Sequence, residues 1–264
     1  MSRARVRVGG AVLALGLAAS VVQVSPAWWS RHQFREPLDL AAAALTGPES
    51  PNVVQDAHED DRSWRRAAEV DTTASASANC DGCTADSSAL HIVHLDRPTE
   101  ATLDNVGVAW SQCVGCRSTA LSVQVVVLRS PQTVRANNRA LAVNAACESC
   151  LTSALAFQIV VVGGRHERLS RAAHDELERW VSEQADALRA AVPAGDPGVA
   201  PSGLRTVADE PDATALLDEL EDLLRGRLGG MQTIERDAEA STGEPEPVGE
   251  PAAEPSPEAA PETV

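Results

Sequence analysis

The sequence predicts an α+β protein in which an antiparallel β meander of about six strands packs against C-terminal helices. Strand-like alternation is concentrated in residues 70–163, Cys-x-x-Cys pairs recur inside this stretch, and helical periodicity follows it. The pairs contain every cysteine of the chain: Cys80, Cys83, Cys113, Cys116, Cys147 and Cys150.

Each pair belongs to a longer repeat. The pairs recur after 33 and then 34 residues, and the phrase CVGCRSTALSVQVVVL at 113–128 returns as CESCLTSALAFQIVVV at 147–162. A fixed period indicates repeated structural units, each of which needs its neighbours to bury its apolar side.

The N-terminus reads as a signal peptide over residues 1–27. A basic start with Arg3, Arg5 and Arg7 precedes an apolar run at 11–24 and small residues suited to cleavage. We expect a secreted or cell-envelope protein, which contacts a membrane only if this segment stays uncleaved. Thiols outside the cytoplasm tend to oxidise, so the even number of closely spaced cysteines favours disulfides.

Residues 28–69 have no sustained period and are predicted to be a disordered linker. The three-unit repeat domain then covers residues 70–163. Its strand-like segments are 70–78, 89–95, 105–110, 121–128, 140–145 and 155–162.

The cysteine pairs are predicted to be disulfide-stapled hairpin tips. The first pair encloses Asp81-Gly82, which is a strong two-residue turn signal. Residues that flank such a turn have Cα atoms about 5.5 Å apart, within the range that a disulfide requires. In a meander the three tips would project from one end of the sheet, about 10 Å apart. Ser149 in the third pair departs from the glycine of the other two pairs.

Two helices are predicted after the repeats. Ser170 can cap an amphipathic helix within residues 164–192, which we expect to pack on the sheet. After a linker at 193–211, a second amphipathic helix occupies residues 212–230. Residues 231–264 are rich in Pro and Glu and are predicted to be a disordered acidic tail.

We expect the strands to need cover on both faces, since Phe157 and Ile159 alternate with small or apolar residues such as Ala156 and Val160. The 164–192 helix can cover one face. The second face is expected to be covered either by the 212–230 helix or by a second copy of the chain.

Two chemical alternatives for the cysteines stay open. In a thiol-disulfide oxidoreductase, a helix N-terminus usually lowers the thiol pKa, whereas strand-like residues flank each pair here. In a zinc-binding domain two pairs would supply four thiolates, but pairs about 30 residues apart exceed the usual spacing of 15 to 20.

Other catalytic signals are weak. His91 and His94 are three residues apart in a strand and so point to opposite faces. His91 occupies the repeat position of Gln124 and Gln158, which favours a polar cross-strand ladder. The sequence therefore predicts no catalytic residues, no metal ligands and no cofactor. The net charge of −16 argues against nucleic acid as a partner.

The phrase NRALAVNAACESCLTSALAFQIVV, which contains Cys147 and Cys150, resembles repeats in uncharacterised exported actinobacterial proteins. In those proteins an A-x-A-x-N strand precedes the cysteine pair and an A-x-Q-V-V strand follows it. The resemblance spans residues 72–191 and implies export and repeat architecture without an activity. We expect a non-enzymatic envelope or interaction protein that associates with itself or with an envelope protein.

Overall fold

The computed structural model describes residues 38–145, 147–163, 169–192 and 212–243. The strands of this part are β1 (Leu38–Leu45), β2 (Asn52–Ser63), β3 (Ala67–Ala78), β4 (Thr84–Asp96), β5 (Glu100–Ser111), β6 (Arg117–Arg129), β7 (Thr133–Asn144), β8 (Leu151–Gly163) and β9 (Met231–Gly243). The helices are α1 (Arg171–Ala191) and α2 (Ala213–Leu228). The predicted signal peptide and the 193–211 linker lie outside the described residues.

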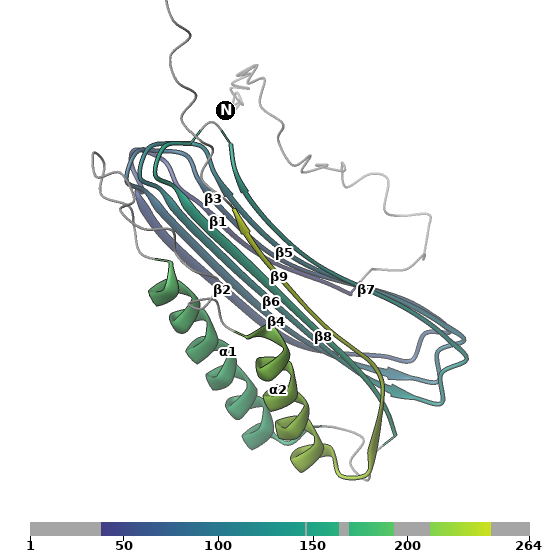
Figure 1. The fold of residues 1–264 in the computed structure, drawn as a ribbon. Helices are drawn as coiled ribbons and strands as arrows, with labels where there is room; N and C mark the ends of the chain where they lie inside the picture. The colour runs from purple at the N-terminus through teal and green to yellow at the C-terminus, as the bar shows by residue number, and fades with distance from the viewer. Residues whose placement is uncertain (1–37, 146, 164–168, 193–211, 244–264) are drawn as a thin grey trace, which may run out of the picture. The chain divides into compact units, whose positions relative to one another are not determined.

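The strands form two parallel sheets that stack as a β-solenoid of about four coils (Figure 1). One sheet has the order β1-β3-β5-β7. The other has the order β2-β4-β6-β8-β9, in which only β9 is antiparallel to its neighbour. Each coil therefore consists of an odd-numbered strand, a turn and an even-numbered strand.

The predicted antiparallel meander is wrong, because strands that follow one another in the chain belong to different sheets. β3 pairs with β5 and β4 pairs with β6, in parallel and in a register that matches the repeat. Ala76 lies beside Ala109, and Leu121 beside Leu155, so one repeat is one coil. β4, β6 and β8 are buried on both faces and largely apolar, which is typical of parallel sheets that are covered on both sides.

The space between the sheets is filled in three layers along the strand direction. Alanine dominates the layer beside the cysteine turns, and larger side chains such as Val70, Leu103 and Val126 fill the opposite end. Buried polar side chains lie between these layers: Thr72, His91, Asn105, Gln124, Asn138 and Gln158. The sheets approach closely at Gly107, where an added Cβ would lie 2.7 Å from the Leu155 carbonyl oxygen.

Both helices pack on the outer face of the five-stranded sheet (Figure 1). The Ser170 hydroxyl accepts a hydrogen bond from the Ala173 N–H at 3.2 Å, as expected for an N-cap. The Asp212 carboxylate caps α2 in the same way. Leu177 and Leu220 lie in one hydrophobic cluster with Phe157 of β8.

The second apolar face of the predicted sheet is the interior of the solenoid. Ala156 and Val160 of β8 face the four-stranded sheet, so neither α2 nor a second copy is needed to cover them. The apolar surface that we ascribed to a missing partner is therefore buried within one chain.

Two segments that were predicted to be disordered contribute strands. The 28–69 linker contains β1, β2 and the start of β3, which form a first coil without cysteines. The 231–264 tail contains β9, which pairs with β8 and covers the end of the solenoid. The Ala140 and Ala142 N–H groups of β7 donate to the side chains of Glu239 and Ser241. Residues 244–264 lie outside the described part.

Candidate functional site

The cysteine pairs occupy the turns that carry the chain from the four-stranded to the five-stranded sheet. Both sulfurs of each pair lie at disulfide distance, with Cα separations of 5.3, 5.9 and 5.8 Å in chain order. Gly82 and Gly115 adopt positive φ angles of 68° and 65°. Ser149 has a φ of 57°, so the third turn keeps this conformation without glycine.

The turns stack directly on one another. Gly82 donates to the Val114 carbonyl at 2.8 Å, and Gly115 donates to the Glu148 carbonyl at 2.8 Å. Successive turns thus follow the spacing of hydrogen-bonded strands, about 4.8 Å, and the predicted spacing of about 10 Å is wrong. The reason is that each coil adds one strand, not two, to each sheet.

The stacking brings sulfurs of neighbouring coils together. The Sγ atoms of Cys113, Cys116 and Cys150 lie within 4.8 Å of one another. Strands begin directly after the turns, at Thr84, Arg117 and Leu151, so no helix N-terminus activates these sulfurs. A pair that is closed as a disulfide offers no thiolate as a metal ligand.

His91, Gln124 and Gln158 form the polar ladder that the repeat positions predicted. They are register partners in β4, β6 and β8, and Gln158 donates to the Gln124 side chain at 2.8 Å. The His91 ring bonds to Thr72 at 3.0 Å and to Asp61 at 3.1 Å. Burial lowers the pKa of His91, although Asp61 acts in the opposite direction. The ladder is an internally bonded layer of the core.

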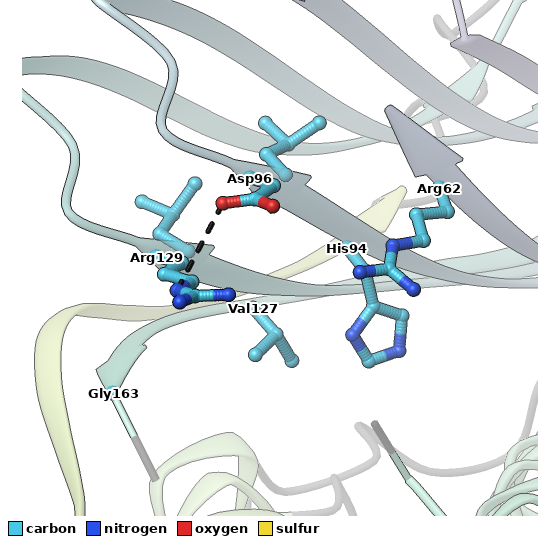
Figure 2. A pocket seen from close by; sticks show the side chains of 8 residues that line it. Arg62, His94, Asp96, Val127, Arg129 and Gly163 are labelled. Carbon is cyan, nitrogen blue, oxygen red and sulfur yellow. Dashed lines mark ion pairs between the residues drawn. The ribbon is translucent and has the colours of Figure 1, made fainter. Parts of the chain in front are cut away.

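A pocket of about 320 Å³ lies at the opposite end of the sheet from the cysteine turns (Figure 2). Its lining includes Arg62, His94, Asp96 and Arg129, and the last two form an ion pair at 3.9 Å. The lining offers charges of both signs but contains no nucleophilic side chain next to a base, so it supports no particular reaction.

The outer face of the four-stranded sheet, here called the bare face, is not covered by α1 or α2, which both lie on the other sheet. Its apolar part, the bare patch, lies on β5 and β7 and was missed by the sequence analysis. The bare patch comprises Val106, Val108, Trp110, Leu141 and Val143. Leu141 is 51% exposed. Alternation of buried and exposed residues along β5 and β7 is the signal that could have revealed it.

Acidic side chains cross the other half of the bare face. Asp39, Asp71 and Asp104 are register partners, and Asn137 ends the row on β7. Burial raises the pKa of Asp71 to about 6, and the nearby charges of Asp39 and Asp104 act in the same direction. Arg139, two residues along β7 from Asn137, lies 3.5 Å from Asp104 and places a positive charge beside the row.

Comparison of the chain with known protein families, with curated proteins and with solved structures finds no match. Neither α1 nor α2 combines the length and apolar character that a membrane crossing needs.

Proposed function

We propose that this protein is an exported, non-enzymatic structural module that associates with a second copy of itself through the bare face. The observation that carries the proposal is the bare patch, which exposes apolar side chains on a rigid sheet. Contiguous apolar surface of this kind marks an interaction site on soluble proteins more often than an inert surface. Export is supported by the N-terminal segment and by the cysteines at disulfide distance.

The bare face is complementary to itself in side-chain size. Large residues, Val108 and Leu141, lie on β5 and β7, and their register partners on β3 and β1 are the small residues Ser75 and Ala43. A twofold axis parallel to the strands would lay β7 of one copy over β1 of the other. Leu141 would then meet Ala43, and Val108 would meet Ser75, in an isologous interface.

The charges are complementary at the edges of this arrangement and repel at its centre, where Asp71 on β3 would face Asp104 on β5 of the other copy. Asp39 on β1 would face the segment of β7 that carries Arg135 and Arg139, whose side chains are 68% and 60% exposed. By contrast, the edge strand β2 is a poor surface for association, because its charged side chains such as Glu59 and Asp61 discourage strand addition.

Sedimentation equilibrium of the exported chain at micromolar concentration tests the proposal. The wild type should have the mass of two chains, whereas Val108→Asp and Leu141→Asp should have the mass of one with an unchanged melting temperature. Val54→Asp is a matched control, because Val54 is 53% exposed on β2 of the other sheet. A single-chain mass for the wild type, or equal masses for all variants, would reject association through the bare face.

A further inference from the structure

Three side chains with metal-binding chemistry converge where the first turn of α1 meets the solenoid. They are Asp60 of β2, His94 of β4 and His174 of α1, whose ligand atoms all lie within 4.8 Å of one another. The Asp60 carboxylate is 3.5 Å from His94 Nε2 and 3.4 Å from His174 Nε2. Residues far apart in the chain thus direct one carboxylate and two imidazoles to a common point.

The spacing matches the requirement of a tetrahedral metal ion. Zinc–nitrogen and zinc–oxygen bonds are about 2.0–2.1 Å long, so neighbouring ligands of a tetrahedral zinc ion lie about 3.3–3.4 Å apart. Each carboxylate–imidazole distance is close to one edge of such a tetrahedron, with Asp60 Oδ1 facing His94 and Asp60 Oδ2 facing His174. Imidazole nitrogen suits zinc, copper and nickel, whereas calcium and magnesium prefer oxygen ligands only.

The two histidines of the cluster are largely buried, whereas its aspartate is accessible to solvent. The side chains of His94 and His174 are 7% and 18% exposed, whereas Asp60 is 49% exposed and leaves a path for an ion and a water ligand. Arg62 lies beside His94 (Figure 2) and its positive charge opposes a cation. The Arg62 guanidinium carbon lies 4.6 Å from the centroid of the Trp64 ring. This cation–π contact gives Arg62 a partner outside the cluster.

We propose that Asp60, His94 and His174 bind one divalent transition-metal ion of the zinc class, with water completing the tetrahedron. The ion fastens the start of α1 to the solenoid. The other end of α1 is already fastened by charge, since Arg189 lies 3.9 Å from Asp56 and 4.0 Å from Asp86. The site is on the covered sheet and is independent of the self-association proposed for the bare face.

Titration of the full exported chain with Zn²⁺, followed by calorimetry, tests the site. The protein must be prepared without a polyhistidine tag and with its cysteines oxidised, as verified by counting free thiols. We expect one ion per chain, with affinity at least tenfold weaker in Asp60→Asn and in His174→Ala. His58→Ala is the matched control, because His58 is an exposed histidine on the same strand, and it should keep full affinity.

Two further readouts separate this site from the cysteine turns and from a folding defect. Zn²⁺ should raise the melting temperature of the wild type and of His58→Ala by several degrees, but not that of His174→Ala. The bound Co²⁺ analogue should show no sulfur-to-metal charge-transfer band. Absence of Zn²⁺ binding, full affinity in both site variants, or a thiolate band would overturn the assignment.

Discussion

In both sheets of the solenoid neighbouring coils pair in register, and β3 to β8 are 12 or 13 residues long, yet only one outer face is covered by helices. On the five-stranded sheet the outward side chains are large and apolar, and Phe157 is fully buried beneath Trp180 of α1 at a ring-centroid distance of 5.9 Å. On the four-stranded sheet the equivalent surface is small or polar over β1 and β3 except for Leu45, which is 66% exposed, and Leu141 on β7 stays half exposed. Coil geometry is thus common to both faces, and side-chain size determines which face receives the helices.

The strongest test of this difference is a matched pair of truncations. Phe157→Ala should lower the free energy of unfolding by about 3–5 kcal/mol, because it opens a cavity beneath the helices. Leu141→Ala should change it by less than about 0.5 kcal/mol in the dissociated chain, because Leu141 is largely solvated there. Urea unfolding at low protein concentration measures both, and equal losses would mean that the two faces are packed alike.

The separation of the sheets can be probed from the interior. Gly107→Ala should cost up to about 3 kcal/mol, because the new methyl group would meet the Leu155 carbonyl oxygen at 2.7 Å and push the sheets apart. Ala109→Gly, two residues along the same strand, removes a methyl group and is the control for strand propensity. A neutral Gly107→Ala substitution would contradict the close approach of the two sheets.

The cysteine turns join the two faces, and their loss should have a smaller effect. The double variant Cys113→Ser and Cys116→Ser should lose about 2 kcal/mol, because the closed loop is very short. Non-reducing peptide mapping of the exported wild type should find three bonds, each within one turn. The proximity of Cys116 to Cys150 also permits a disulfide between two turns. Finding such a bond would contradict the prediction, because it would cross-link neighbouring coils.

The smallest expected effect concerns the acidic row of the bare face. The pKa of Asp71 rises from 3.8 to about 6 on folding, so the folded state binds the proton more tightly. Below pH 3.8 both states are protonated and there is no penalty; between 3.8 and about 6 stability falls as pH rises, and above that the penalty is complete. Because Asp71 is only partly buried, solvent screening reduces this penalty to about 1 kcal/mol.

Asp71→Asn should therefore stabilise the chain by about 1 kcal/mol at neutral pH and have little effect near pH 4. Denaturant unfolding at the two pH values measures the difference. Asp104→Asn should stabilise less, because Asp104 accepts from Asn137 at 2.5 Å and lies near Arg139. An Asp71 variant that is destabilised at neutral pH would contradict the pKa shift.

Local structure was largely predictable from the sequence, whereas the pairing of strands was not. The predicted segments 89–95 and 155–162 lie within β4 and β8, and the Ser170 cap begins α1 as expected. The turn predicted at Gly82 is present, and Gly82 has a positive φ. This signal could not distinguish a hairpin from a turn between sheets, because both require a positive φ at this position. The signal for the pairing was instead the apolar character of both faces of β4, β6 and β8, which indicates a parallel sheet.

The first coil and the capping strand were missed for a related reason. The turn between β1 and β2 has no cysteines, and β2 is an edge strand whose charges resemble a linker. β9 is polar and contributes through backbone pairing with β8. Hydrophobic periodicity therefore reveals neither β2 nor β9. The Asp60, His94 and His174 cluster was likewise hidden, because only the fold joins its three elements.

Hydroxyl-radical footprinting at two protein concentrations tests the central claim that one face is covered within the chain and the other between chains. Trp180 of α1 is buried against the five-stranded sheet, Trp64 is 64% exposed on a turn, and Trp110 lies in the bare patch. Trp180 should be protected and Trp64 reactive at both concentrations. Trp110 should react in dilute solution and become protected as the chains associate. Equal reactivity of Trp110 at both concentrations, with sedimentation showing that the concentrated chain has associated, would contradict the account.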